Sequence, residues 1–164
     1  MGYYVDFLKE CDLFYNLTST QLEMIESICE EINYKKGDLI FEENSREKEL
    51  YLILQGEVEI IIQPALSTPQ NSDKNNRRLA LLQRTQSFGE IALVDEGMRS
   101  AGVLAASKKV DLLMVNRDHL LKLCSTYPEL GYKIMYNLAA DLAQKIRNSG
   151  FRYRETFLYG NIID

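Results

Sequence analysis

The chain has 164 residues, and its 19 lysines and arginines against 24 aspartates and glutamates give a formal net charge of −5 with the single histidine neutral. That length suits one domain with a substantial core, and 46% hydrophobic and 26% charged residues argue against a disordered or fibrous chain. The acidic balance argues against a whole-surface hold on DNA or RNA but leaves room for a local site for a small anion. One histidine and three cysteines offer little for metal or nucleophilic chemistry, so the composition favours binding over catalysis.

The three cysteines, Cys11, Cys29 and Cys124, are far apart and form no CxxC pair. This spacing fits neither a disulfide framework nor a zinc site, and it predicts reduced thiols in a cytoplasmic protein. The N-terminus has no basic region followed by an apolar run, and no segment reaches the ~18 apolar residues that a membrane span needs. We therefore expect a soluble cytoplasmic protein with no membrane association.

A helix is expected near the N-terminus. Thr18 or Ser19 is a suitable N-cap, and a helical period of apolar residues follows at Leu22, Ile25, Ile28 and Ile32. The pattern predicts a helix to about Glu31, ahead of a turn at 35–38.

Short runs rich in β-branched and aromatic residues follow at 38–41, 50–54, 58–62, 79–82, 101–105 and 110–115. Turn residues separate the early runs at 43–45 and 55–56. Closely spaced strands of this kind favour an antiparallel jelly-roll β-barrel, a cupin-like double-stranded β-helix, over βαβ units. Between them, residues 63–78 are rich in Pro, Ser, Asn and charge, so we expect a surface loop and assign it no function.

The final third returns to helix. Asn116 is expected to cap a short helix, Pro128 opens a longer one, and Gly150 is a stop signal. An apolar stripe on the longer helix repeats every fourth residue at Leu130, Ile134, Leu138, Leu142 and Ile146. The stripe is either internal core or the seam of a homodimer, and its length favours the dimer. The fold class is thus mainly β with flanking helices: residues 1–126 form the barrel with its N-terminal helix, and 127–164 form a long helix and tail within the same single domain.

The segment 87–101 carries the sharpest chemical pattern. Gly89 lets the backbone approach a ligand, and Glu90 supplies a carboxylate that only accepts hydrogen bonds. Nine positions later, Arg99 offers a planar fork of donors suited to a phosphate, with the Ser100 hydroxyl beside it. A carboxylate for sugar hydroxyls and an arginine for a phosphate together indicate a nucleotide site.

This segment resembles the phosphate-binding cassette of the cyclic nucleotide-binding domain family, whose pattern is Phe-Gly-Glu-(Ile/Leu)-Ala-Leu followed by Arg-(Ser/Thr/Ala)-Ala. Here it reads Phe88-Gly89-Glu90-Ile91-Ala92-Leu93 and Arg99-Ser100-Ala101. The resemblance covers roughly residues 12–148 and includes the segments 37–41, 50–58 and 112–118. It implies a ligand-binding set of Phe88, Gly89, Glu90, Ile91, Ala92, Arg99, Ser100 and Ala101.

The resemblance implies that Glu90 accepts a hydrogen bond from the ribose 2′-hydroxyl and that the Gly89 backbone lies against the sugar. Arg99 pairs with the exocyclic oxygens of the cyclic phosphate, and Ser100 and the N–H of Ala92 complete that grip. The alternative for Arg99 is a salt bridge with Asp95 or Glu96, and for Glu90 a solvated turn carboxylate.

Two departures from the family pattern stand out. Glu43-Asn44 replaces the usual Glu-Gly, although Asn also tolerates positive φ. In DNA-regulating bacterial relatives, hydroxyl residues on the long helix contact the base, whereas the matching region here is Lys145-Ile146-Arg147. The identity of the base is therefore left open by the sequence, with cyclic AMP expected first and cyclic GMP second.

Bacterial regulators of this family continue into a helix-turn-helix, whereas here 151–164 follow the long helix, so we expect no DNA binding by the chain alone. A basic stretch, formed by Lys145, Arg147, Arg152 and Arg154, suits a solvated helix end or a lid over the ligand. The aromatic residues of the tail suit packing against the barrel or a ring that covers the base. His119 is expected to be a surface or capping residue.

We expect a stand-alone cyclic nucleotide sensor without catalytic activity, cofactor or metal, in which the ligand repositions the long helix. The alternatives are a transcription-regulator remnant that needs a partner chain, a dimerisation module that binds no nucleotide, and an unusual hydrolase.

Overall fold

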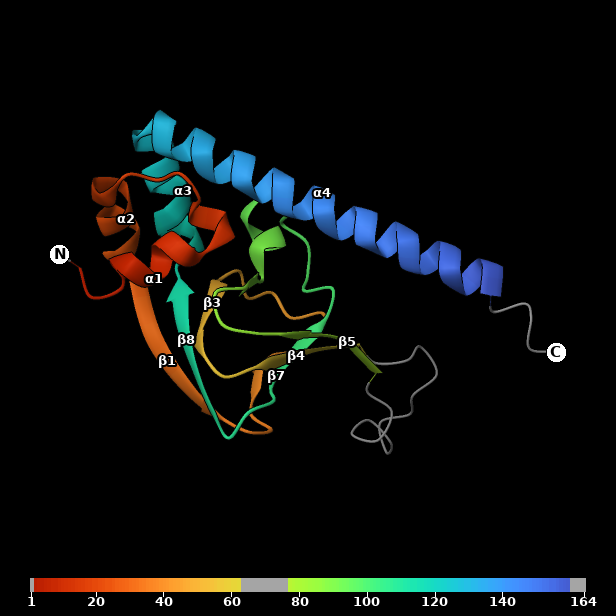
Figure 1. The fold of residues 1–164 in the computed structure, drawn as a ribbon. Helices are drawn as coiled ribbons and strands as arrows, with labels where there is room; N and C mark the ends of the chain where they lie inside the picture. Colours follow the sequence, from red (N-terminus) through yellow and green to blue (C-terminus); the bar gives the residue numbers. More distant parts are fainter. Residues whose placement is uncertain (1, 63–76, 160–164) are drawn as a thin grey trace.

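The computed structural model describes residues 2–62 and 77–159 (Figure 1). In chain order its elements are α1 (Val5–Glu10), η1 (Asp12–Phe14), α2 (Ser19–Glu26), β1 (Cys29–Lys35), β2 (Leu39–Phe41), β3 (Leu50–Gln55), β4 (Val58–Ile62), β5 (Arg77–Leu82), β6 (Ser87–Phe88), η2 (Glu90–Leu93), β7 (Gly102–Ala105), β8 (Lys109–Val115), α3 (Arg117–Thr126) and α4 (Pro128–Tyr159). The helices gather on one side of the strands, and α4 runs across them and on past the sheets (Figure 1). Within these ranges, no helix combines the length and apolar character that crossing a membrane requires.

The strands form two four-stranded antiparallel sheets, in the orders β1-β8-β3-β6 and β2-β7-β4-β5. This confirms the mainly antiparallel β class with flanking helices. The described strands of the two sheets are not hydrogen-bonded across to each other, so they form an open roll rather than a closed barrel. The expected strand runs are all present, and β5 begins at Arg77, inside the segment that we assigned to the loop. Residues 63–76 of that loop lie outside the described residues.

The predicted first helix is too long. Its N-cap is correct, because the Thr18 side chain accepts a hydrogen bond from the N–H of Gln21, but α2 ends at Glu26. Residues 29–35, which include the predicted helical Ile32, form β1 instead. That strand pairs with β8 without a break from Cys29↔Val115 to Lys35↔Lys109, and the ladder outweighs the weak helical preference of the sequence.

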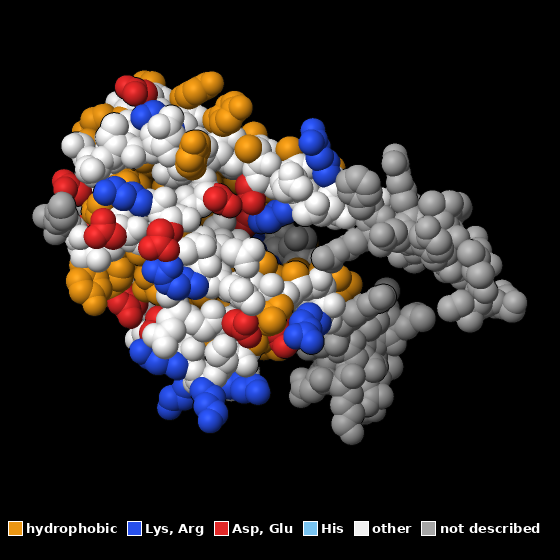
Figure 2. Space-filling model, viewed as in Figure 1, with side chains coloured by type: hydrophobic (Ala, Val, Ile, Leu, Met, Phe, Trp, Pro, Cys, Tyr) orange, Lys and Arg blue, Asp and Glu red, His pale blue; other side chains and the backbone are white. Residues whose placement is uncertain are grey.

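Three predicted turns have the geometry that their residues favour. Gly37 and Gly56 lie at φ 90° and 84°, and Asn44 replaces the family glycine at φ 65°. The first of these turns and the β7–β8 turn bring together four exposed lysines, Lys35, Lys36, Lys108 and Lys109. They gather at the tip of the roll opposite α4 (Figure 2). Positive charge is therefore concentrated at one end of an acidic chain.

The C-terminal helices begin where predicted. The Asn116 side chain accepts a hydrogen bond from the N–H of His119 and caps α3, and α4 begins at Pro128. The predicted stop at Gly150 is wrong, because α4 continues to Tyr159. A single exposed glycine costs a helix about 1 kcal/mol relative to alanine, which by itself is too little to end a long helix.

The inner face of α4 belongs to the core of its own chain. Leu130, Ile134 and Leu138 are at most 2% exposed and pack with residues of the N-terminal helices, β3 and β8. The prediction that Leu130–Ile146 forms a dimer seam is therefore wrong for this face, since the first three turns of the stripe are already buried. Ile146, by contrast, is 71% exposed.

We predict that Ile134→Ala lowers the free energy of unfolding by about 2–5 kcal/mol, because it leaves a cavity under α4. The matched variant Gln144→Ala, whose side chain is exposed on the same helix, should cost less than about 0.5 kcal/mol. Urea unfolding of the two variants checks this. Equal losses would show that the face of α4 that carries Ile134 does not anchor the helix.

Candidate functional site

The 87–101 segment turns sharply between β6 and η2. Gly89 lies at φ 77° in the left-handed region and leads directly into the short helix that begins at Glu90. A Cβ at Gly89 would lie 2.8 Å from Nη1 of Arg99 and 2.9 Å from the carbonyl oxygen of Glu49. The position therefore needs glycine for its backbone conformation and for the close approach of Arg99.

Aromatic rings support this turn from below. Phe88, the last residue of β6, is 3% exposed and stacks on Tyr51 with ring centroids 5.2 Å apart. Phe41 of β2 contacts both rings, at 6.0 Å from Tyr51 and 5.9 Å from Phe88. These rings join the two sheets beneath the turn, so Phe88 anchors the turn instead of facing outward.

Arg99 lies over this aromatic cluster. Its guanidinium carbon is 4.2 Å from the centroid of the Phe41 ring. Nη1 donates to the carbonyl of Gly89 at 3.1 Å and Nη2 to the carbonyl of Glu49 at 2.6 Å, while the buried Nε has no partner among the described residues. Burial lowers the pKa of the guanidinium from its ordinary value, although nearby Tyr51 and Glu49 oppose this shift. The predicted alternative of a salt bridge with Asp95 or Glu96 is not formed.

Glu90 is 5% exposed, so the alternative of a solvated turn carboxylate is wrong. Its Oε1 accepts a hydrogen bond from Nζ of Lys145, which reaches across from α4. The same ammonium lies 2.9 Å from Oδ2 of Asp141, one turn earlier on that helix. Burial works against a charge on Lys145, but the two carboxylates outweigh it and raise the pKa of the lysine above its ordinary value.

The η2 turn is also tied to α3. Nε of Arg117, at the start of α3, donates to the carbonyl of Ala92 at 2.5 Å. The N–H of Ala92 donates back to the carbonyl of Gly89 at 3.3 Å. The η2 turn is therefore held by α3 at the backbone of Ala92 and by α4 at the side chain of Glu90.

Other predicted residues lie around this centre. Ile91 is 46% exposed and Ser100 is exposed, whereas Ala92 is buried and Ala101 half-buried. The structure thus brings Gly89, Glu90 and Arg99 together. Arg99 donates to the carbonyl of Gly89, and Glu90 is the next residue in the chain. Ile91 and Ser100 lie at the open surface of the same segment.

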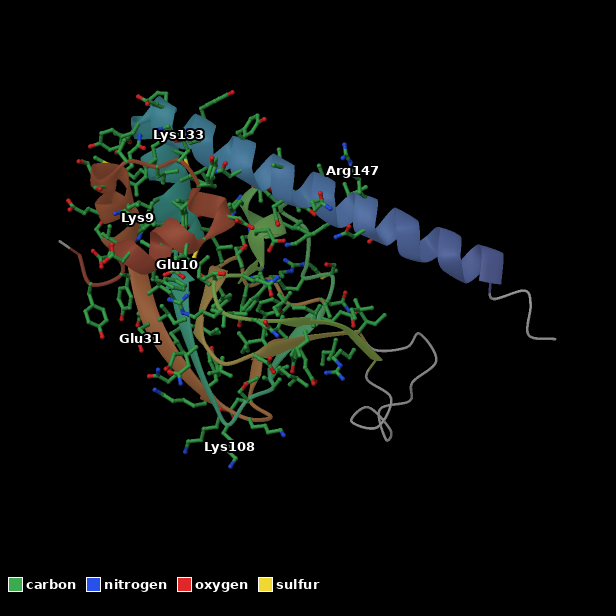
Figure 3. All side chains as sticks on the ribbon, in the orientation of Figure 1. Lys9, Glu10, Glu31, Lys108, Lys133 and Arg147 are labelled. Atoms are coloured by element: carbon green, nitrogen blue, oxygen red, sulfur yellow. The ribbon has the colours of Figure 1, made fainter. Side chains whose placement is uncertain are left out.

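Three residues that the sequence reasoning did not place at the site belong to it. Lys145 was assigned to a basic stretch and to the region that matches the base-contacting part of the family's long helix, although its position four residues after Asp141 is the spacing of a helical ion pair. Arg147, from the same stretch, points away from the roll (Figure 3). No local signal marks Phe41 or Arg117, whose contacts with Arg99 and Ala92 arise from the tertiary fold.

In the described part of the chain, no cluster of three or more His, Cys, Asp or Glu side chains is placed to hold a metal ion. A pocket of about 310 Å³ between α2 and the α3–α4 junction lies away from the 87–101 segment. A second pocket, of about 540 Å³, is lined by residues 45–49 and 116–118 and adjoins the segment, because Glu49 and Arg117 contact Arg99 and Ala92.

Comparison with known proteins points to one family. The model of the cyclic nucleotide-binding domain matches residues 31–127. A cyclic AMP receptor protein of Thermus thermophilus is 30% identical over 87% of this chain and 60% of its own length. A cGMP-dependent protein kinase of Drosophila melanogaster is 27% identical over 91% of this chain, but the match covers 13% of the kinase.

A solved structure agrees with these matches. The crystal structure of Thermus thermophilus catabolite activator protein aligns with a TM-score of 0.72 and 29% identity, over 87% of this chain and 62% of that one. This chain therefore spans less than two thirds of the length of each of these three proteins.

We predict that Gly89→Ala destabilises the protein more than Gly37→Ala does. Both glycines have positive φ, for which alanine costs about 1–2 kcal/mol, but a Cβ at Gly37 meets nothing within 4 Å. At Gly89 it also displaces Arg99 and presses on the backbone of Glu49, which adds about 1–3 kcal/mol. Urea unfolding measures the free energy of unfolding of both variants. A larger loss for Gly37→Ala would contradict the close packing of this turn.

Proposed function

Since the chain belongs to the cyclic nucleotide-binding domain family, we propose that it binds a cyclic nucleotide at the 87–101 segment and acts as a regulatory module without catalytic activity. One observation carries the proposal. The carboxylate of Glu90, the residue after Gly89, and the guanidinium of Arg99, which donates to the Gly89 carbonyl, both belong to residues that are more than nine-tenths buried. Burying opposite charges in one segment is costly, which favours a role in recognition over a role in stability.

We assign each group to one part of the ligand. Glu90 accepts a hydrogen bond from the ribose 2′-hydroxyl, and Arg99 binds the exocyclic oxygens of the cyclic phosphate. Ser100 adds a further donor to the phosphate, and the N–H of Ala92 joins it by leaving its 3.3 Å contact with the Gly89 carbonyl. The guanidinium supports this assignment, because its buried Nε has no partner among the described residues and its two other nitrogens bind only neutral carbonyls. A phosphate is a stronger acceptor than a carbonyl, so it draws Arg99 to itself.

Both cyclic AMP and cyclic GMP are candidate ligands. The names of the relatives include a cyclic AMP receptor and a cGMP-dependent kinase, so they favour neither base. We propose that cyclic AMP binds first and cyclic GMP second. The ligand then acts through α3 and α4, which contact the segment at Ala92 and Glu90. Residues 127–164 accordingly work as part of the same domain as 1–126. The three free thiols suit a reducing, cytoplasmic setting for this module.

We also propose that the module is a homodimer, through a face of α4 other than the one we expected. Exposed apolar or small residues follow each other at spacings of four and three, at Tyr132, Tyr136, Ala139, Ala143 and Ile146. In the sequence the same spacing continues at Gly150, Tyr153 and Phe157. This is the heptad pattern of a coiled coil, and because the seam matches itself, a second copy of the chain is the partner that fits it. The second half of α4 extends past the sheets, where another helix can lie alongside (Figure 1).

We predict that isothermal titration calorimetry detects cyclic AMP binding and that Arg99→Ala weakens it about 10- to 100-fold, the worth of one charge-assisted contact. The affinity of Arg99→Lys for cyclic AMP should fall between those of the wild type and Arg99→Ala, because lysine keeps the charge but loses the planar fork. Arg84→Ala removes an exposed arginine that pairs with Glu10 and should leave binding unchanged. Absence of binding of cyclic AMP and cyclic GMP by the wild type at high micromolar concentration would refute the proposed function, as would full binding by Arg99→Ala.

For the dimer, we predict that Ala143→Glu shifts the chain to monomer, because it buries an unpaired carboxylate in the seam. Gln144→Glu introduces the same residue next to it but off the seam, and should leave the dimer intact. Sedimentation velocity of the two variants at several concentrations distinguishes them. A wild-type chain that stays monomeric at the highest concentration would rule out the seam.

A further inference from the structure

The contact between Lys145 and Glu90 links the ligand site to α4. Glu90 is the carboxylate that we assign to the ribose, and its side chain is only 6% exposed. The group that reaches it is the ammonium of Lys145, whose own side chain is 46% exposed and lies on a different element. One oxygen of the carboxylate is therefore already occupied by a residue of the chain itself.

Two features hold Lys145 in this position. Asp141 lies one helical turn away and fixes the ammonium from the other side, at 2.9 Å. The helix is itself anchored by its buried inner face, which presents residues 134, 138, 141 and 145 toward the roll. The lysine stem is long and flexible, and its side chain is 46% exposed, so the ammonium can leave Glu90 for water. Lys145 is thus held firmly enough to compete with a ligand and loosely enough to be displaced.

On the basis of the proposed function, we infer that Lys145 competes with the ribose 2′-hydroxyl for Glu90 and so determines both the affinity of the site and its selectivity for ribose over deoxyribose. A ligand with a 2′-hydroxyl replaces the hydrogen bond from Lys145 to Glu90 with its own. The free energy gained on binding is therefore reduced by the lost contact between Lys145 and Glu90. A 2′-deoxy ligand has no donor to offer, and it leaves Lys145 on the carboxylate.

The same exchange also changes the contacts between α4 and the 87–101 segment. When the hydroxyl takes Glu90, the ammonium keeps Asp141 but loses its contact with the 87–101 segment. One of the ties between α4 and the ligand site is then broken by the ligand. A ligand shifts a conformational equilibrium only through such differential contacts.

The test is calorimetry with cyclic AMP and with 2′-deoxy cyclic AMP on the wild type, Lys145→Met and Arg147→Met. Methionine is a good helix former, so the half-exposed position 145 should tolerate it. We expect Lys145→Met to bind cyclic AMP about fivefold more tightly, as removal of a half-exposed ion pair permits. Binding of the 2′-deoxy ligand should stay within about twofold of the wild type. The dissociation constant for 2′-deoxy cyclic AMP divided by that for cyclic AMP should therefore be larger in Lys145→Met than in the wild type.

Arg147→Met is the matched control, because it removes the same charge two positions away on the side of α4 that faces away from the roll (Figure 3). It should leave both affinities unchanged. If the wild type binds cyclic AMP but Lys145→Met does not raise this ratio of dissociation constants, the role of Lys145 is overturned and the proposed function is not. A wild type that binds neither cyclic AMP nor cyclic GMP overturns the proposed function itself, and this inference with it.

Discussion

Two buried opposite charges impose the constraint on which this site depends. Glu90 and Arg99 both lie in the 87–101 segment with almost no access to water, and an ion that loses its hydration without a partner costs several kcal/mol. The segment is therefore stable only where other elements supply polar atoms. Arg99 takes carbonyls from Gly89 and Glu49, and Glu90 takes an ammonium from Lys145.

The architecture supplies those partners from distant parts of the chain. Glu49 immediately precedes β3, Arg117 begins α3, and Lys145 lies midway along α4. Each contributes one hydrogen bond to the same short stretch of backbone and side chain. The 87–101 segment thus serves as the junction between the sheets and the C-terminal helices. This is the position from which a bound anion can act on both.

Much of this arrangement is readable in the sequence where the signal is local. The turn glycines, the caps at Thr18 and Asn116 and the strand runs all depend on residue types at short spacing, and the structure has them as predicted. The assignment of Glu90 and Arg99 to a ligand rests on the same kind of local pattern and stays a prediction. The strand β1 was missed, because its pairing with β8 joins residues about 80 positions apart, which no local pattern reports.

The same limit applies to α4. Its two apolar stripes, one through Ile134 and one through Tyr136, both have a helical spacing, and only the packing of the roll decides which is buried. The role of Lys145 was missed for a related reason. Its partner Asp141 is visible in the sequence, whereas Glu90 meets it only after the chain has folded.

The unbroken course of α4 through Gly150 has a mechanical consequence. At 1.5 Å per residue, the 32 residues of this helix make a rod of about 48 Å, and roughly 21 Å of it lies beyond Lys145. A tilt of roughly 10° about that residue displaces the distal end by about 4 Å. A helix that stopped at Gly150 would move its end by less than half as much. The continuous rod is thus a longer lever arm than a helix that ends at Gly150, so the same tilt moves its distal end further.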